Sequence, residues 1–243
     1  MRRAMTPAPG QAAATDREPD DALLRLGIYT IPEAARLTRV PFASIRRWTH
    51  GYAFRKGGER RWSPPLVVPQ LDPVDEIPAV SFLDLQELRF LHAFRSRGAS
   101  WQTLRVAHER AKERIGHSHP FSTGRFRSAG REILTEVAVS EKDRALENVV
   151  SRQLVFKKFI TPYLRGLEFD DQIVIRWYPR RDRRVIIDPK RNFGQPVVRE
   201  GVPTRILASS YRVERSVERV ARWYDVEDAS VRAAVDFERR LAA

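Results

Sequence analysis

The stretch from Tyr29 to Trp62 constrains the fold most strongly, because it carries the start and stop signals of two short helices in succession. Thr30 and Glu33 have the spacing of a capping box, in which each satisfies a free backbone N–H group at the helix start. Pro41 ends this first helix, because the residue before a proline is driven out of the α region. A second helix is expected over about 42–49. The segment therefore predicts two helices with a tight connection, followed by a glycine-containing hairpin.

The second helix is expected to bury one face and to present polar side chains on the other. Ile45 and Trp48 are three residues apart, so they share the face that we expect to be buried. Ser44, Arg46, Arg47 and Thr49 are left to face outward, and His50 follows them.

The charge of this stretch predicts its partner. Between Arg36 and Arg61 there are eight cations, and Glu59 is the only acid. A solvated helix face normally interleaves both signs. A helix presenting arginines in front of a basic hairpin instead suits duplex DNA, with the helix in the major groove and the hairpin on phosphates or in the minor groove. The alternative is a basic surface without a ligand. The predicted DNA-binding residues, expected to form one exposed ridge, are Ser44, Arg46, Arg47, Thr49, His50, Arg55, Lys56, Arg60 and Arg61.

Two motifs in this half of the chain resemble a known family. The run YTIPEAARLTRV, followed by the pair Ile45–Arg46, is similar to the N-terminal half of MerR-type transcriptional regulators. A second motif over 79–107 resembles the next helix pair of that family. The resemblance implies a winged helix-turn-helix domain that binds DNA. Two features depart from the family pattern: Arg39 stands where a glycine in a left-handed turn is usual, and a proline-rich stretch over 63–78 extends the hairpin. The matching positions of the second motif are Asp84, Leu88, Leu91, Arg95, Gly98 and Ser100.

Composition narrows the partner and the compartment. The formal net charge of +13 and the pI near 10.7 indicate an anionic partner, with nucleic acid as the first candidate and an anionic membrane surface as its competitor. No apolar run approaches the roughly 20 residues that span a bilayer. The first residues lack the apolar core of a signal peptide, and the chain has no cysteine. We therefore expect a cytoplasmic protein.

The chain of 243 residues is expected to be mainly α with short β-hairpins (α+β), and to divide into four parts. These are a disordered tail over 1–24, a MerR-like winged-helix DNA-binding domain over 25–116, an α+β connector over 117–184 and a second winged-helix-like domain over 185–243. The connector is predicted to contain a β-hairpin over 121–139, a helix over 149–164 and a second hairpin that joins 172–179 to 185–188.

The C-terminal part carries a second resemblance. Two short apolar strands flank Gly194 and Pro196, and two helices follow. These motifs resemble a domain of unknown function that recurs in bacterial VapB-type antitoxins, although Glu214 stands near a position where that family tends to have glycine. With the MerR-like front, this resemblance implies an antitoxin whose partner is a PIN-like ribonuclease toxin. The matching residues are Ile187, Asp188, Pro189, Gly194, Pro196, Val197, Val198, Ser216, Val217, Val220, Ala221, Tyr224, Val226 and the run Val231–Phe237.

Catalytic and metal-binding candidates are weak. His117 and His119 lack a third ligand nearby, so they are interpreted as loop histidines. The acids near 168–171 and 225–228 lie beside predicted helix or strand ends, where carboxylates cap and solvate. The sequence contains no phosphate-binding glycine loop and no nucleophile elbow. We therefore expect no enzyme activity, no cofactor and no metal.

These observations and resemblances together predict an antitoxin that binds operator DNA, represses its own operon and neutralises a PIN-like ribonuclease toxin. A homodimer that reads two half-sites is expected, because a single helix-turn-helix binds weakly. Two alternatives stay open: a MerR-type regulator that responds to a small molecule, and an RNA-binding module. The last helix mixes acids with its arginines, which favours a dimer or toxin surface over a second DNA-binding surface.

Overall fold

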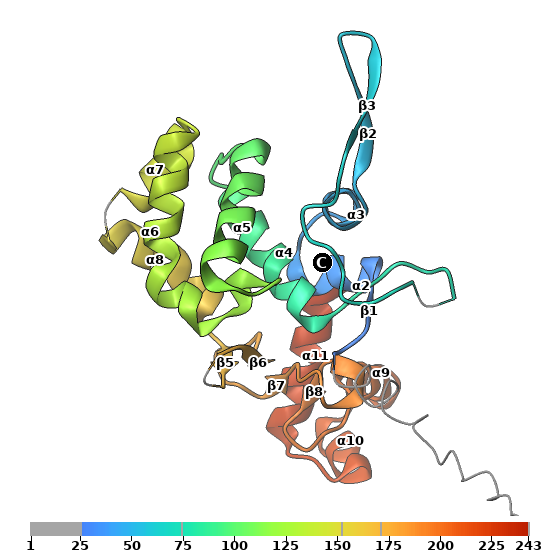
Figure 1. Ribbon diagram of the computed structural model, residues 1–243. Coiled ribbons are helices and arrows are strands. Elements are labelled where there is room, and N and C mark those ends of the chain that lie inside the picture. Colours follow the sequence, from blue (N-terminus) through green and yellow to red (C-terminus); the bar gives the residue numbers. More distant parts are fainter. Residues whose placement is uncertain (1–25, 74, 152, 171, 243) are drawn as a thin grey trace, which may run out of the picture.

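The computed structural model describes residues 26–73, 75–151, 153–170 and 172–242, so the expected tail over 1–24 lies outside the described residues. The fold is mainly helical with four short antiparallel strand pairs in the described ranges, which confirms the expected α+β class. A two-stranded hairpin projects from the body at one end, and the last helices lie at the other end (Figure 1).

The N-terminal unit follows the predicted order. Thr30 and Glu33 form the expected capping box, in which the backbone N–H of Thr30 donates to Glu33 Oε2 at 2.9 Å. Strand β1 pairs antiparallel with β4, which closes the unit behind the hairpin. The elements are β1 (Tyr29–Thr30), α2 (Ile31–Thr38), α3 (Phe42–His50), β2 (Tyr52–Lys56), β3 (Glu59–Ser63) and β4 (Ala79–Val80).

Arg39 builds the corner between α2 and α3 without a glycine. Its backbone is left-handed, with φ of 60° and ψ of 20°, and its N–H donates to the carbonyl of Ala35 at 2.8 Å. A non-glycine residue in this conformation costs about 1 kcal/mol. The Arg39 guanidinium donates to the carbonyl of Arg240 at 3.1 Å, so the side chain also makes a contact that a glycine could not make.

Serine side chains cap the starts of the next two helices. Ser81 and Asp84 form a capping box at the start of α4 (Phe82–Arg95). The Ser100 side chain caps α5 (Trp101–Ile115), which ends at Gly116 in a left-handed conformation. The proline-rich stretch after the hairpin returns to the body, where the backbone N–H groups of Leu66 and Val67 donate to the carbonyl of Trp48.

The predicted hairpin over 121–139 is wrong. After a 3₁₀ turn (Pro120–Ser122), residues Gly124–Ser140 form a single helix, α6. Its buried residues Phe126, Ile133, Leu134 and Val137 follow helical spacing rather than alternation. Gly130, which suggested a turn, lies inside the helix. A side chain does not fit at this position, because a Cβ atom there would come within 2.7 Å of the Phe126 ring.

The rest of the connector also differs from the prediction. The helix expected over 149–164 is two helices, α7 (Arg144–Val150) and α8 (Gln153–Leu164). The expected pairing of 172–179 with 185–188 is present only as one antiparallel bridge, in which Trp177 and Ile187 exchange two hydrogen bonds of 2.9 Å. Along its length β6 (Val174–Trp177) pairs instead with β5 (Leu167–Phe169). Strand β5 lies closer in sequence, and the turn to β6 is closed by the hydrogen bond from the Asp170 N–H to the Ile173 carbonyl at 3.1 Å. At the open end of this hairpin, the N–H of Tyr178 donates to the Gly166 carbonyl.

The C-terminal strand pair forms as the sequence predicts, but three helices follow it rather than the two expected. Strand β7 (Val185–Ile186) pairs with β8 (Val197–Val198) across a short 3₁₀ turn (Asn192–Gly194). Pro203 precedes the first of these helices. The helices are α9 (Thr204–Glu214), α10 (Val217–Tyr224) and α11 (Asp228–Ala242).

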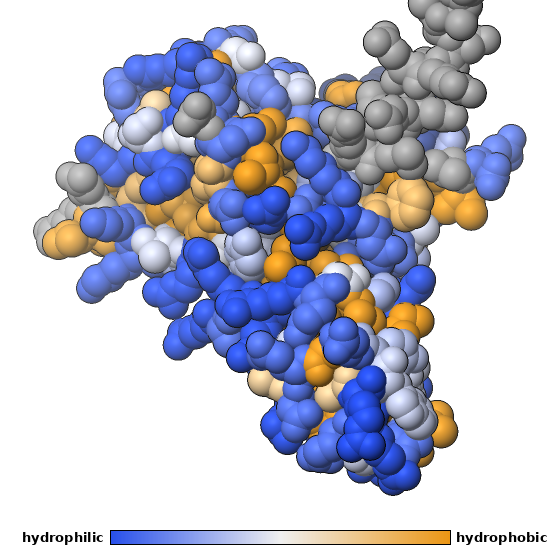
Figure 2. Space-filling view, turned by 90° about the horizontal axis from the view of Figure 1, so that it is seen from below, coloured by the Kyte–Doolittle hydropathy of each residue, from blue (hydrophilic) through white to orange (hydrophobic). Residues whose placement is uncertain are grey.

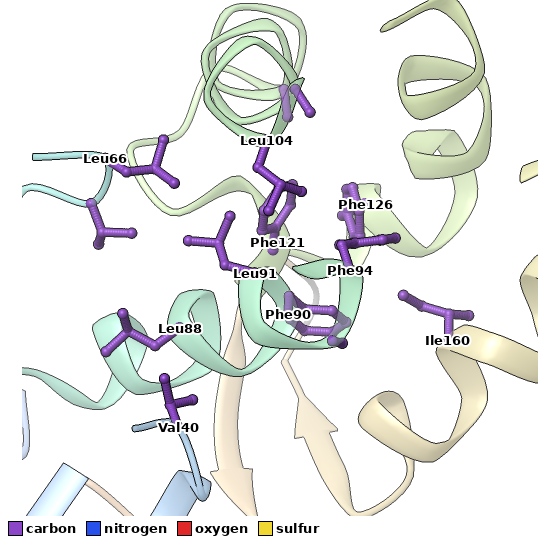
Figure 3. Packing of buried hydrophobic residues seen from close by; sticks show 14 of the residues in the cluster. Val40, Leu66, Leu88, Phe90, Leu91, Phe94, Leu104, Phe121, Phe126 and Ile160 are labelled. Atoms are coloured by element: carbon purple, nitrogen blue, oxygen red, sulfur yellow. The ribbon is translucent and has the colours of Figure 1, made fainter. Parts of the chain in front are cut away.

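One apolar core runs through the first two expected domains. A continuous cluster of buried residues extends from Tyr29 to Ile187, and side chains of α4 form its centre. Leu88, Phe90, Leu91 and Phe94 on α4 face side chains from α5, α6 and α8 (Figure 3). Residues on the two sides of the expected boundary at 116 therefore share one core.

The C-terminal helices have a smaller core of their own, and the C-terminal part of the protein packs against β1 and α2. The Tyr29 hydroxyl donates to the carbonyl of Gly194 at 2.7 Å, and the N–H of Ile28 donates to the carbonyl of Phe193 at 3.0 Å. Leu37 of α2 packs against a cluster that contains Phe237 of α11. The helix-turn-helix unit is thus held from below by the C-terminal helices (Figure 1).

Candidate nucleic-acid interface

Helix α3 is fixed to the body by its apolar face. Ile45 and Trp48 are buried, and the Trp48 ring stacks on Trp101 of α5 with 4.9 Å between centroids. On the opposite face Arg46 and Arg47 are exposed, and Ser44 is half-buried. The rigid packing presents the two guanidinium groups to solvent from a supported helix.

Thr49 does not face outward, which corrects the prediction. It is only 2% exposed, because it lies one turn beyond Ile45 on the same face, and its hydroxyl donates to the Ile45 carbonyl at 2.8 Å. Thr49 Oγ1 also lies 2.7 Å from His50 Nδ1. The Thr49 hydroxyl donates its proton to the Ile45 carbonyl, so in the hydrogen bond with His50 the ring Nδ1–H is the donor. Nε2 of the neutral ring is then left as an acceptor. Partial burial and the nearby Arg46 hold the pKa of His50 below its usual range, so the ring is neutral at pH 7.

The hairpin of β2 and β3, which we call the wing, is exposed from Ala53 to Trp62. Its register places Arg55 directly opposite Arg60, and Phe54 opposite Arg61. Because side chains alternate along strands, Arg55 and Arg60 lie on one face while Lys56 and Arg61 lie on the other. The expected single ridge of cations is therefore wrong. A ribbon with cations on both faces can instead contact both walls of a groove.

The base of the wing is clamped by α5. Arg105 donates to the carbonyls of Pro65 and Pro64 at 3.1 and 2.8 Å, and to Ser63 Oγ at 3.3 Å. At the other strand, Gly51 has a φ of 72°, and a Cβ atom there would lie 2.5 Å from the Ser63 carbonyl oxygen. Sequence reasoning missed Arg105, because nothing in the local sequence of α5 distinguishes it from a solvent-exposed cation.

Exposed aromatic side chains accompany the cations. Phe42 at the start of α3 is 47% exposed, and Trp62 on the wing is 61% exposed. The Arg47 guanidinium lies over the Tyr52 ring, 5.5 Å from its centroid, which links α3 to the wing. Such side chains can contact thymine methyl groups or sugars. The sequence signal that could have found them is the alternation of aromatic and basic residues over 52–62.

Most cations on α3 and the wing have no acidic partner among the described residues. Within the described ranges, Arg46, Arg47, Arg55, Lys56 and Arg60 form no ion pair, and only Arg61 contacts an acid, Glu59 at 3.2 Å. The Arg55–Arg60 pair places like charges directly opposite each other, which destabilises an isolated hairpin. An anionic partner would relieve this repulsion.

The histidine and acid candidates are structural. His119 lies in the loop before the 3₁₀ turn, as expected, but it is buried there, and its Nε2 lies 2.7 Å from Asp84 Oδ1. Burial lowers the pKa of His119, but the hydrogen bond to Asp84 and the charges of Glu87 and Asp84 outweigh it and raise the pKa above its usual value. Glu168 accepts hydrogen bonds from Arg176 and Tyr178.

In the described part of the chain, no group of three or more His, Cys, Asp or Glu residues is arranged to hold a metal. Nor is any helix in those ranges both long and apolar enough to cross a bilayer.

Residues 27–108 match a family model described as "Putative DNA-binding HTH domain". This range runs from the strand before α2 into α5 and includes α3 and the wing. Residues 27–108 form a helix-turn-helix domain. Its supporting helices α4 and α5 are the ones that hold α3 and the wing in place.

Two comparisons extend beyond this domain. The chain is 28% identical over 222 residues to the Mycobacterium tuberculosis protein named "Putative antitoxin VapB45", covering 86% of this chain and 92% of that protein. The X-ray crystal structure of Rv2018 from Mycobacterium tuberculosis superposes with a TM-score of 0.68 at 25% identity, covering 85% of this chain and 96% of that chain. The likeness therefore includes the connector and the C-terminal helices.

Proposed function

We propose that this chain is an antitoxin of a type II toxin–antitoxin system, which binds operator DNA to repress its own operon and neutralises a PIN-like ribonuclease toxin. The DNA-binding part is supported by the cations on α3 and the wing, of which only Arg61 forms an ion pair in the described ranges, and by the helix-turn-helix domain that holds them. The antitoxin part is supported by likeness to a protein of that name over most of both chains. Neither role requires catalysis.

In this proposal α3 enters the major groove. Arg46 and Arg47 can grip guanine edges or phosphates bidentately, because the guanidinium is a planar fork of donors. His50 Nε2 can accept a hydrogen bond from a base amino group, and Ser44 can donate to a phosphate. Thr49 is left out of the contact set, since its hydroxyl is used inside α3.

The wing enters the neighbouring minor groove. Its two-faced arrangement lets Arg55 and Arg60 approach one phosphate wall while Lys56 and Arg61 approach the other. The clamp at Arg105 fixes the angle between wing and helix, so the two elements meet the duplex in one orientation. We propose a homodimer in which two such units read half-sites about one helical turn apart.

The test is a fluorescence polarisation titration of the full chain against duplex DNA from upstream of its own gene, over a range of salt concentrations. Affinity should fall steeply with salt, because several phosphates are neutralised. Arg46→Ala should weaken specific binding by about 1–3 kcal/mol if it reads a base. A flat salt dependence, or better binding to structured RNA than to duplex DNA, contradicts operator binding. For the antitoxin role, the purified chain should inhibit the ribonuclease activity of the toxin encoded beside it.

A further inference from the structure

Helices α6 and α8 lie on the far side of α5 from α3 (Figure 1), and a second basic surface lies between them. Between α6 and α8, next to β5, the protein forms a cavity of about 620 Å³, which we call the α6–α8 groove. No described residue in its lining is a carboxylate. The cations in the lining are Arg127, Arg131, Lys157, Arg165 and Arg183.

Four of these five cations form two rows, and the fifth, Arg183, lies over the Tyr178 ring, 4.8 Å from its centroid. Arg127 and Arg131 are four residues apart and therefore share one face of α6. Lys157 lies on α8, and Arg165 lies eight residues further, just beyond the end of the helix at Leu164. Eight helical residues span about 12 Å. The groove is therefore elongated, which suits an extended or helical segment better than a single compact anion.

The floor between the rows is apolar. Phe156, Ile160 and Leu164 recur every four residues along α8, so they form one stripe. Phe156 and Ile160 are each 6% exposed, and Leu164 is half-buried. Seen from below, hydrophobic residues lie between hydrophilic ones on the side of the molecule that holds α8 and β5 (Figure 2). A matching ligand carries negative charge along two edges and apolar side chains between them.

The nearby acids in the described ranges are bound to other groups and do not pair with these cations. None of the five lining cations forms an ion pair within the described ranges. Glu168 is engaged by Arg176 and Tyr178, and Asp170 Oδ1 accepts from the backbone N–H groups of Gln172 and Ile173. On the same helix α6, by contrast, Glu132 and Glu136 both pair with Arg114.

The aromatic side chains argue against nucleic acid as the ligand. Binding of single strands relies on exposed aromatic faces on which bases stack. Here Phe156 is buried in the floor, and the Phe169 ring is covered by the Arg127 guanidinium, 5.4 Å from its centroid. The groove offers charge and apolar surface, but it offers no open ring to a base.

We propose that the α6–α8 groove binds an acidic amphipathic segment of a partner protein. Carboxylates on the segment pair with the two rows of cations, and its apolar side chains pack against Leu164, the half-buried end of the stripe on α8, as in helix-in-groove recognition. The inference deepens the proposed function, on which it rests, by placing the toxin-binding surface on the connector rather than on α11.

The experiment uses the full chain and two charge-reversed variants. Lys157→Glu/Arg165→Glu alters the groove at two exposed side chains. Arg55→Glu/Arg60→Glu changes the net charge equally on the wing and is the matched control. The first probe is a labelled helical peptide with two rows of glutamates, each spaced i, i+4, on either side of a row of leucines. The second probe is a labelled single-stranded oligonucleotide. Circular dichroism checks that both variants are folded.

The groove variant should bind the acidic peptide about tenfold more weakly while the wing variant binds it like the wild type. Equal peptide affinity in the wild type and the groove variant, or equal loss in both variants, overturns the proposal. Loss of the oligonucleotide rather than the peptide in the groove variant overturns it in favour of nucleic acid.

Toxin capture separates this inference from the proposed function. If the wild type and the groove variant bind the toxin equally, the groove is not its binding surface and the inference falls, while the antitoxin role stands. If the wild type does not bind the toxin, the antitoxin role falls, and the peptide titration alone decides whether the groove binds acidic segments.

Discussion

Single residues far from the recognition face determine how the wing is presented. Arg105 lies on α5 rather than on the recognition helix, yet its three hydrogen bonds hold the chain at the point where the wing rejoins the body. An arginine suits this position because one guanidinium can donate to several carbonyl oxygens at once. At the other strand, Gly51 allows the backbone approach that the clamp requires.

Arg105→Leu should weaken DNA binding without removing any DNA contact. The variant keeps the apolar stem but loses the hydrogen bonds to Pro64 and Pro65, so the wing is free to change its angle. We expect an affinity loss of about 1 kcal/mol, set by the entropy of ordering the wing on binding. Polarisation titrations measure the loss, and amide exchange over 59–63 should speed up. Unchanged exchange there would contradict the role of the clamp.

His119 makes stability depend on pH. Its pKa is raised in the folded state, so its contribution is fully present below the unfolded value near 6.5 and is lost as the pH rises through the folded value. His119→Gln should therefore destabilise the protein more at pH 5.5 than at pH 8.5, as urea unfolding would measure. His117→Gln, which removes a histidine without an ion pair in the described ranges, is the control. A gap that widens with pH would reverse the assigned sign.

Helix α6 shows that an element can be misjudged from its turn-forming residues. The Ser-Ala-Gly run at 128–130 has turn composition, but the apolar residues around it keep helical spacing across the glycine. Thr123 caps the helix, and its side chain accepts from the N–H of Phe126. Position 130 requires a glycine because the Phe126 ring, one turn earlier in α6, occupies the space that a side chain would need.

Gly130→Ala tests this explanation. Alanine favours a helix by about 1 kcal/mol over glycine, so an unconstrained site would gain stability. Here the new Cβ would lie 2.7 Å from the Phe126 ring, so we expect a net loss of about 1–3 kcal/mol from overpacking. Ser128→Ala, at an exposed position of the same helix, is the control. A more stable Gly130→Ala protein in urea unfolding would show that the Phe126 ring moves aside easily.

At the scale of the whole molecule, the N-terminal elements of the described chain contact its C-terminal elements. Tyr29 is buried and holds the Gly194 carbonyl, Arg39 holds the carbonyl of Arg240, and Leu37 packs beside Phe237. The helix-turn-helix domain therefore rests on the C-terminal helices, and the connector packs against its other side through α4. Contacts on either side of the domain can influence how α3 is held.

Gly194→Ala should weaken this junction more than Gly201→Ala. Both glycines have left-handed backbones, with φ of 80° and 93°, so both substitutions carry the same kind of backbone strain. A Cβ at Gly194 would lie 2.2 Å from the Tyr29 hydroxyl, whereas a Cβ at Gly201 meets open space. We expect Gly194→Ala to cost about 1–3 kcal/mol more in thermal or urea unfolding. Equal costs would mean that the Tyr29 contact adds little.

The sequence by itself determined the elements whose signals are local. The capping boxes at Thr30 and Ser81, the stop at Gly116 and the amphipathic stripes of α9 to α11 depend on neighbours within a few residues, so they could be predicted. The identity of the cations on α3 and the wing could also be predicted, because it is composition. Only the tertiary structure decided which face Thr49 takes, how strand register divides the wing cations, which strand β6 pairs with, and that Arg105 clamps the wing. The side of Thr49 and the contacts of Arg105 depend on burial and on partners distant in the sequence. The wing and the β5–β6 pair depend on strand register, which turn and charge patterns do not fix.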